Sequence, residues 1–499
     1  MTYQVVIPMT GVGQRFVDAG YKTLKPLIHV DGKSIVEHVL NMYTDAEKVI
    51  CVISRDHEQK ELLAAEICRI RPDSVVIEIS KHKLGPGHAV LQAKSAIDPY
   101  LPVLVSYCDW AGCWNPYQMI EQLKNHSGSI LTYTGFHPHM LRSTQFAYVR
   151  KSAGDVVDIQ EKKPYTDSPM QEEASAGCYG FSTGSLLIKA LEWQIDSNEN
   201  LNGEFYLSLT YKNLLQNGER IGTVLMDKFY QWGTPEDLQD WEYWNNSINS
   251  LPGVAKLKID SHNLVLAAGR GSRISDISQV SKPNISIEGQ HLWEYSAPAQ
   301  IVFRSNRVVT RPEVGLALRE DVQAISVSTV TEGQAISARI GIDRIEDPGD
   351  YPINIMSSDN AFTPDNFLRI ADMTEQYNLI VWTSKGYPPS QLNPKQYAWI
   401  NMKSKKVLKK EAPPNFVDWE MLIGNFTFLS CGLALTLIEE LILKNIRIND
   451  EYYLDSVIDL AFAHEIAVTT LSISNFLAIG TPEELLTYRY FARSLIPSV

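Results

Sequence analysis

Residues 5–16 read VVIPMTGVGQRF and residues 24–39 read LKPLIHVDGKSIVEHV, and a close echo returns as LVLAAGRGSRI at 264–274 and SKPNISIEGQHLWEY at 281–295. In both places an apolar, strand-like run leads directly into a glycine loop, and a Lys-Pro dipeptide follows. Because the whole arrangement repeats, these stretches indicate a duplicated fold and not one long domain.

Other landmarks recur in the same order. NGEFYLS (202–208) is echoed by NDEYYLD (449–455), and GTPEDL (233–238) by GTPEEL (480–485). The offset between the copies changes only from 258 residues, Gly11 to Gly269, to 247 residues at these landmarks. We therefore predict two domains, 1–249 and 260–499, joined by a short linker in 249–260 that carries Pro252 and Gly253.

Strand-like and helix-like patterns alternate inside each copy. In the first copy we expect strands at Gln4–Met9, Lys48–Ile53 and Pro102–Tyr107, and helices at Lys33–Met42 and His88–Ile97. This alternation favours an α/β fold with a mostly parallel central sheet and helices on both faces. Ligands of such sheets bind outside the carboxyl ends of the strands. Gly11 and Asp109 both stand at such ends.

The composition excludes several classes of protein. The chain has 499 residues, 44% of them hydrophobic, and its net charge is -13 without any basic block. Disorder, a nucleic-acid partner and an anionic membrane surface are therefore not expected. The six cysteines form no C-x-x-C pair, so neither a zinc site nor a disulfide framework is predicted. With no signal peptide at the start, we expect a cytoplasmic protein, and a homo-oligomer remains possible.

Three other features have plain structural interpretations. The uncharged run Met421–Ile438 is long enough to suggest insertion into a membrane, but its polar residues favour a soluble strand followed by a helix. His137 and His139 predict a turn with solvated histidines, since no third metal ligand is in view. The lysine-rich run Lys403–Lys410 predicts a solvated hairpin.

The loop Gly11-Val12-Gly13-Gln14-Arg15 has the chemistry of a phosphate site. Glycines after a strand let backbone N–H groups approach an anion, and Arg15 and Lys25 add positive charge. The loop lacks the third glycine of a dinucleotide fingerprint and the G-K-[ST] of a P-loop.

The combined pattern resembles the sugar-phosphate nucleotidyltransferases, the pyrophosphorylases that make nucleotide sugars. Their signature is G-x-G-x-R, a gap, then K-P-L and G-K, matched here by Gly11, Gly13, Arg15, Lys25, Pro26, Leu27, Gly32 and Lys33. The resemblance implies two tandem Rossmann-like, GT-A-like domains. It also implies magnesium-dependent transfer from a nucleoside triphosphate to a sugar 1-phosphate, with release of pyrophosphate and a product that feeds a surface polysaccharide.

The resemblance also implies roles for individual residues. Arg15 and Lys25 would act on the phosphates as catalytic cations, and Asp109 would bind Mg²⁺. Residues of two further groups would contact the nucleotide base (Gly85, Gly87) and the sugar phosphate (Glu161, Lys162, Gly177, Glu204). One departure from the family pattern argues against a second metal ligand. Where some relatives carry an aspartate two positions before G-T, this chain has Gln231, and the second copy has Ala478.

The second copy keeps the nucleotide half of the pattern. Its counterparts are Gly269, Gly271, Arg273 and Lys282 for the nucleotide, and Asp359 for a metal. Its sugar half differs, with Glu411 and Ala412 opposite Glu161 and Lys162, and Leu422-Ile423-Gly424 opposite Ser175-Ala176-Gly177. The second copy either handles a different second substrate, or binds nucleotide and regulates or stabilises the first.

Other functions stay open at this point. The acceptor could be a non-sugar such as phosphocholine. A nucleotide-sugar-dependent glycosyltransferase would need a D-x-D motif, which Asp109-Trp110-Ala111 does not supply. The remaining alternative is a non-catalytic nucleotide-binding regulator built from two degenerate copies.

Overall fold

The computed structural model describes residues 2–251 and 256–494, which divide into two compact units, Met1–Asp240 and Trp241–Val499. The division falls inside helix α8 (Pro235–Ser250). Part of the predicted linker, residues 252–255 with Pro252 and Gly253, lies outside the described residues.

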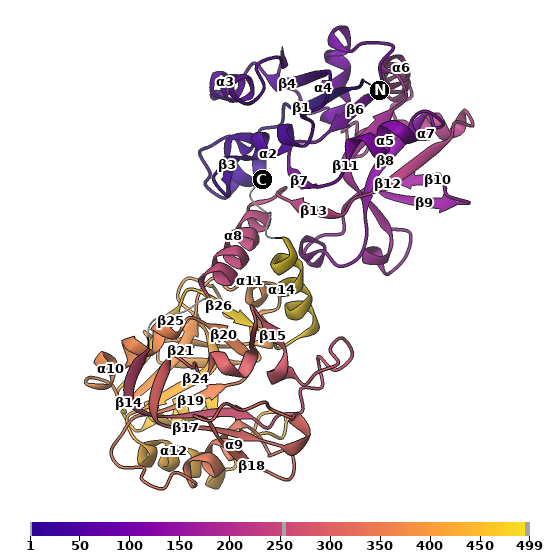
Figure 1. Ribbon diagram of the computed structural model, residues 1–499. Helices are drawn as coiled ribbons and strands as arrows, with labels where there is room; N and C mark the ends of the chain where they lie inside the picture. Colours follow the sequence, from indigo (N-terminus) through magenta and orange to yellow (C-terminus); the bar gives the residue numbers. More distant parts are fainter. Residues whose placement is uncertain (1, 252–255, 495–499) are drawn as a thin grey trace. The chain divides into compact units, whose positions relative to one another are not determined.

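The first unit is an α/β structure around a nine-stranded mixed sheet (Figure 1). Its strands are β1 (Gln4–Met9), β4 (Lys48–Ser54), β5 (Val75–Ile79), β6 (Val103–Ser106), β8 (Gly128–Tyr133), β9 (Tyr148–Ser152), β10 (Asp155–Gln160), β11 (Glu173–Phe181) and β12 (Ile221–Leu225). Strands β6, β1, β4 and β5 are parallel neighbours, and β11 runs antiparallel between β6 and β8. A two-stranded ribbon pairs β7 (Trp110–Cys113) with β13 (Lys228–Gln231).

Helices follow the strands as the sequence alternation predicts. They are α1 (Gln14–Asp18), α2 (Ile35–Asn41), α3 (Lys60–Ile70), α4 (Gly85–Gln92), α5 (Pro116–Gln122), α6 (Gly184–Asp196), α7 (Leu207–Gln216) and the short helix η1 (Lys25–Leu27). Helix α4 begins at Gly85, three residues before the predicted start. Helices α4, α6 and α7 share one core with strands of the sheet, through residues such as Val6, Val90 and Leu191.

The second unit repeats this topology. Its nine-stranded sheet contains β14 (Leu257–Ala267), β17 (Ile301–Thr310), β18 (Gln323–Ser326), β19 (Ile353–Ser357), β21 (Leu379–Ser384), β22 (Ala398–Asn401), β23 (Lys406–Lys409), β24 (Glu420–Phe428) and β25 (Val468–Ile473). The order β18-β17-β14-β19-β24-β21-β25 is that of β5-β4-β1-β6-β11-β8-β12 in the first unit. The ribbon β20 (Asn360–Phe362) with β26 (Phe476–Ala478) repeats β7 with β13. The duplication read from the sequence is confirmed in the sheets.

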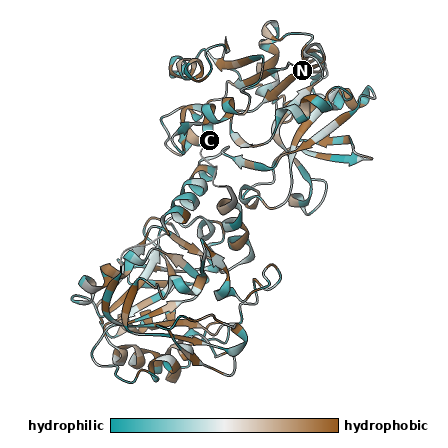
Figure 2. Cartoon of the chain, in the orientation of Figure 1, coloured by the Kyte–Doolittle hydropathy of each residue, from teal (hydrophilic) through white to brown (hydrophobic). Residues whose placement is uncertain are grey.

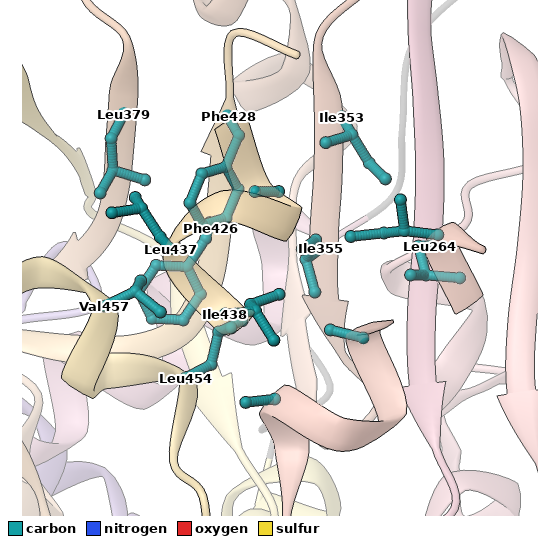
Figure 3. Packing of buried hydrophobic residues seen from close by; sticks show 14 of the residues in the cluster. Leu264, Ile353, Ile355, Leu379, Phe426, Phe428, Leu437, Ile438, Leu454 and Val457 are labelled. Carbon is teal, nitrogen blue, oxygen red and sulfur yellow. The ribbon is translucent and has the colours of Figure 1, made fainter. Parts of the chain in front are cut away.

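The core of the second unit lies between its sheet and helices α9 (Gln334–Ile342), α12 (Cys431–Leu443) and α13 (Val457–Ala463). Figure 3 shows Leu264, Ile355 and Phe426 of the strands packed with Leu437 and Val457 of the helices. Hydrophobic residues recur along the strands of both units in Figure 2. Truncating one of these buried leucines to alanine typically destabilises a fold by about 2–5 kcal/mol, so this packing carries much of the stability.

The uncharged run Met421–Ile438 forms part of β24 and of α12, as predicted. In the described part of the chain, no helix combines the length and apolar character needed to cross a membrane.

Candidate functional site

The glycine loop of the first unit lies against the lysine predicted to face the phosphates. β1 ends at Met9, and Gly13, with φ 65°, caps the short helix α1. A Cβ at Gly13 would lie 3.3 Å from the Cβ of Lys25, the first residue of η1, with Pro26 next to it. A left-handed backbone and this close approach both require a small residue at position 13.

Lys25 joins two strand ends. Its Nζ donates to Oδ2 of Asp109 at 3.0 Å and to the carbonyl oxygen of Gly233 at 3.1 Å. Asp109 follows β6, and Gly233 follows β13. Side chains 84 residues apart thus meet at the carboxyl end of the parallel strands, with exposed fractions of 13% for Lys25 and 33% for Asp109.

Arg15 is exposed on α1 and has no ion pair among the described residues. It lies close enough to Tyr206 to lower the pKa of its hydroxyl, although burial and Glu204 together raise that pKa above its usual value. The guanidinium therefore lies within electrostatic range of Tyr206, and its charge is available to an anion.

The predicted sugar-side residues form one polar group. Lys162 Nζ donates to the Tyr206 hydroxyl oxygen at 2.5 Å, and the Tyr206 hydroxyl donates to Glu204. Glu161 accepts from Ser208 Oγ at 2.5 Å, and burial raises the pKa of its carboxyl. Carboxylates and hydroxyls placed in this way can bind the hydroxyl groups of a polyol, while the ammonium of Lys162 can bind an anion.

The predicted base-side glycines lie against this polar group. At Gly85, with φ 83°, a Cβ would be 2.8 Å from the backbone nitrogen of Phe205 and 3.1 Å from the Cβ of Glu204. Gly87 N donates to the carbonyl oxygen of Phe205 at 2.8 Å. The close approach that these glycines allow is thus to the Glu204–Phe205 backbone, and their contact with a base stays a prediction. At Gly177, with φ 87°, a Cβ would lie 3.1 Å from the ring of Tyr107.

Asp109 offers one carboxylate oxygen to Mg²⁺. Oδ2 is bonded to Lys25, and Oδ1 makes no hydrogen bond with the described residues. Magnesium commonly takes one or two carboxylates and completes its shell with phosphate oxygens and water. No group of three or more His, Cys, Asp and Glu side chains able to hold a metal occurs in the described ranges. Asp109 would thus hold the ion with the phosphates, and the binding of Mg²⁺ stays a prediction.

The second unit repeats the nucleotide half of the site. Gly271 has φ 63°, and a Cβ there would lie 3.4 Å from the Cβ of Lys282. Lys282 Nζ donates to Asp359 Oδ2 at 2.5 Å. Burial raises the pKa of Asp359, but Lys282 and the hydroxyl of Ser357 more than offset this and leave it lowered. A cavity of about 710 Å³ is lined by Gly269–Arg273, Lys282 and Asp359.

The sequence alignment of the sugar half was wrong. In the first unit Tyr148 of β9 pairs with both Gln160 and Ala174, and in the second Trp399 pairs with both Leu408 and Met421. Counting on from these pairs places Lys409 and Lys410 at the positions of Glu161 and Lys162. Lys162 and Lys410 also share an unusual positive φ, 57° and 61°. Glu411 and Ala412 therefore do not occupy the positions assigned to them, whereas Gly424 does correspond to Gly177.

The prediction of solvated histidines was also wrong. His137 and His139 are only 8% and 7% exposed, and they pack beside Tyr133 and Phe146. Burial lowers the pKa of His137 to about 4, so it is neutral at physiological pH. Both rings belong to the core.

Sequence reasoning missed Tyr206, Ser208 and Lys410. Tyr206 and Ser208 lie in the NGEFYLS landmark, two and four residues after Glu204, where Tyr206 bonds Glu204 and Ser208 bonds Glu161; this alternation could have shown them. Lys410 was hidden because the hairpin of the second unit is shorter between its paired ends than that of the first. Lys409 and Lys410 of this hairpin line a cavity. In the run Lys403–Lys410, the exposed lysines are those nearest the turn, Lys403, Lys405 and Lys406.

Known proteins match the first half of the chain. Residues 4–245 match the family model described as Nucleotidyl transferase. The Bifunctional protein GlmU of Paraburkholderia phytofirmans is 28% identical over 274 residues, 53% of this chain and 54% of that protein. The Bifunctional protein GlmU of Listeria innocua is 30% identical over 232 residues, 46% of this chain and 48% of that protein. The chain thus matches only about half the length of these curated relatives.

A solved structure, the nucleoside-diphosphate-sugar pyrophosphorylase from Vibrio cholerae RC9, is similar with a TM-score of 0.40. It is 20% identical, and the match covers 47% of this chain and 98% of that one. At this level of likeness nothing follows for function.

Proposed function

Since the amino-terminal half of the chain belongs to the nucleotidyl transferase family, we propose that it transfers a nucleotidyl group from a nucleoside triphosphate to a sugar 1-phosphate. The observation that carries this proposal is the Lys25–Asp109 pair, held at 3.0 Å beside the glycine loop. Phosphoryl-type transfer depends on positioning and charge neutralisation more than on covalent help from the protein. The site offers both.

The glycine loop and the two cations would bind the triphosphate. Backbone N–H groups of the loop face the anion, Lys25 neutralises charge beside Asp109, and exposed Arg15 meets the outgoing pyrophosphate. Lys25 is fixed by its bonds to Asp109 and Gly233, so little reorganisation is needed when charge develops on the phosphates.

The acceptor would lie on the polar group formed by Glu161, Lys162, Glu204 and Tyr206. Lys162 supplies a cation for the acceptor phosphate, and the two carboxylates accept hydrogen bonds from hydroxyl groups. This donor set favours a sugar over phosphocholine, whose quaternary ammonium forms no hydrogen bond and is recognised by aromatic faces.

The reaction balances without a general base. An oxygen of the acceptor phosphate, already anionic near neutral pH, forms a bond to the α-phosphorus as the bond to the bridging oxygen breaks. The electron pair leaves with pyrophosphate. Holding both substrates in line supplies much of the rate enhancement. When bound, Mg²⁺ would neutralise phosphate charge next to Asp109.

The setting we propose is the cytoplasm, where the product would feed polysaccharide synthesis. The six cysteines are all free, as a reducing compartment allows.

A matrix of triphosphates against sugar 1-phosphates, with pyrophosphate release as the readout and the full chain as the enzyme, tests the proposal. We expect one pair to give Mg²⁺-dependent turnover and Arg15→Ala to lower it by about 100-fold or more. Lys22→Ala, which removes an exposed cation outside the glycine loop, is the matched control. The proposal fails if no pair releases pyrophosphate, or if Arg15→Ala turns over like the control.

A further inference from the structure

We propose that Asp237 is a positioning residue for Lys25, because its carboxylate holds the Gly233–Thr234 peptide with the carbonyl oxygen turned towards the lysine ammonium. Lys25 is the cation that we place beside the phosphates, so this inference rests on the proposed function and deepens it. Asp237 lies in the first turn of α8 and, in the described part of the chain, forms no hydrogen bond with Lys25 itself. Its effect on the lysine must therefore pass through the residues between them.

One peptide group lies between the two side chains. Thr234 N donates to Asp237 Oδ2 at 2.9 Å, and the Gly233 carbonyl oxygen accepts from Lys25 Nζ at 3.1 Å. Both atoms belong to the same peptide group, which is planar and trans, so its N–H and its C=O point in opposite directions. Fixing the N–H on Asp237 therefore fixes the direction of the carbonyl that holds Lys25.

The carboxylate of Asp237 also strengthens the hydrogen bond to Lys25. When an amide donates to a charged acceptor, the peptide group is polarised and its carbonyl oxygen becomes a better acceptor for a cation. Asp237 is only 9% exposed, so water screens this interaction little. Burial raises the pKa of Asp237 to about 7, and the nearby charge of Lys25 acts in the opposite direction.

The segment before Thr234 is attached to the end of β6. Trp232 N donates to the carbonyl oxygen of Asp109 at 2.9 Å, and Lys25 Nζ donates to the carboxylate of the same residue at 3.0 Å. Lys25, Asp109 and the chain from Trp232 to Gly233 thus form a closed circuit of hydrogen bonds. Asp237 is the group that holds this circuit at its Thr234 end.

Asp237 and Thr234 also form a capping box at the start of α8. Thr234 Oγ1 accepts from Asp237 N at 3.2 Å, while Asp237 Oδ2 accepts from Thr234 N. A capping box does not require the Gly233 carbonyl to meet a cation, and a buried carboxylate is unfavourable unless it is paired. The hydrogen bond from Lys25 to Gly233 therefore indicates a role beyond capping.

The second unit holds the corresponding turn differently. Its counterpart of Asp237 is Glu484, whose longer side chain accepts from two amides, Gly480 N at 2.7 Å and Thr481 N at 2.9 Å. Within residues 2–251 and 256–494, Lys282 forms no hydrogen bond with Gly480. The bond between lysine and carbonyl thus accompanies the shorter carboxylate, in the unit that we propose to be active.

A double-mutant cycle on pyrophosphate release by the full chain tests the inference. Asp237→Ala should lower kcat by about 10-fold, because the lysine is still present but is held less well. In the Lys25→Met background the same substitution should lower kcat by less than about 2-fold, since no ammonium is left to position. A purely structural role predicts equal losses in both backgrounds, and that result overturns the inference.

Thr183→Ala is the matched control for the loss of a helix cap. Thr183 caps α6 by accepting from Leu186 N at 3.2 Å, and it follows β11, whose end lies at the edge of the sheet opposite Asp109. It should lower the melting temperature as Asp237→Ala does, with turnover unchanged. Asp237→Asn keeps an acceptor for Thr234 N, so it should turn over faster than Asp237→Ala. An asparagine variant that is folded and no faster overturns the inference.

A readout that needs no turnover separates this inference from the proposed function. In a chain labelled with ¹⁵N at lysine Nζ, the Lys25 ammonium signal is identified by its absence in Lys25→Met. Asp237→Ala should shift this signal and speed its hydrogen exchange, whereas Thr183→Ala should do neither. If Lys25 responds in this way while no substrate pair releases pyrophosphate, the proposed function fails and the positioning of Lys25 by Asp237 stands. If turnover is found and the Lys25 signal ignores Asp237, only this inference fails.

Discussion

The two units of this chain have the same sheet topology and differ in the side chains of the acceptor wall of their candidate sites. Lys25 with Asp109 and Lys282 with Asp359 form the same ion pair at the same strand ends, at 3.0 and 2.5 Å. The acceptor wall, by contrast, exchanges Tyr107, Trp110 and Gln231 for Ser357, Asn360 and Ala478. The difference teaches that phosphate handling depends on backbone and strand ends, whereas the choice of acceptor depends on side chains that can change without disturbing the sheet.

The largest expected effect separates the two ion pairs. Lys25→Met should reduce pyrophosphate release for the substrate pair of the first unit by about 100- to 1000-fold, because a preorganised cation beside the phosphates is removed. Lys282→Met should leave that reaction within about 3-fold, since Lys282 belongs to the other unit and makes none of the contacts of Lys25. Steady-state kinetics with Lys22→Met as the exposed control checks this. Equal losses in both variants would show that the two units do not work separately.

Adding a Cβ at a tightly packed glycine should destabilise either unit, with a smaller effect than the loss of a catalytic cation. Gly85→Ala adds a Cβ 2.8 Å from Phe205 N, and Gly333→Ala adds one 2.5 Å from the carbonyl oxygen of Tyr452, both at positive φ. Each should lower the free energy of unfolding by about 2–4 kcal/mol. Gly20→Ala is the matched control, because its φ of 87° is similar but nothing lies within 4 Å. Denaturant unfolding would contradict the contact argument if all three variants lost the same stability.

A buried carboxyl should give the first unit a pH-dependent stability. Burial raises the pKa of Asp237 to about 7, so the folded state favours the neutral form and stability falls as pH rises from about 4 towards 7. Asp237→Asn keeps an acceptor for Thr234 N and removes the charge. The variant should be more stable than the native chain at pH 8 by about 2 kcal/mol, and the difference should shrink by pH 4.

The corresponding residue of the second unit sharpens this test. Glu484 is also buried with a raised pKa, but it accepts from Tyr387, Tyr397 and two backbone N–H groups. Glu484→Gln replaces one accepting oxygen by a donor, so it should gain less at pH 8 than Asp237→Asn. Chemical denaturation at the two pH values measures both, and a larger gain for Glu484→Gln would contradict this account.

The smallest expected effect concerns a helix start that the units build differently. Ser34 caps α2 by accepting from Glu37 N, whereas His291 of the second unit shares a capping box with Glu294. Ser34→Ala should cost about 1 kcal/mol of stability. Thermal melting of this variant against Ser272→Ala, at an exposed position, provides the check. A loss no greater than that of Ser272→Ala would contradict a stabilising role for the Ser34 cap.

The sequence predicted the architecture because the relevant signals are local and repeated. Alternating apolar runs predicted the strands, and the rule that ligands gather at the ends of parallel strands predicted that Gly11 and Asp109 stand at the same edge of the sheet. The ends of helices were less exact: α4 starts at Gly85 because the glycine turn itself enters the helix.

The acceptor side could not be predicted because its residues depend on pairing between strands distant in sequence. Lys410 was displaced in the alignment by a difference in hairpin length that only the pairs of Trp399 reveal. His137 and His139 were placed in solvent since their burial depends on aromatic side chains from β8 and β13. The binding roles of the site residues stay predictions.

The contact between Gly85–Gly87 and Phe205 links two segments of the candidate site of the first unit. Gly87 N bonds the Phe205 carbonyl and Phe205 N bonds that of Leu84, and Ala335, Tyr452 and Glu332 repeat this pair in the second unit. Each pair of hydrogen bonds connects the start of one helix to a loop that lies more than a hundred residues further along the chain. The two segments should therefore loosen as a single cooperative element, with slow and matching deuterium uptake at both amides.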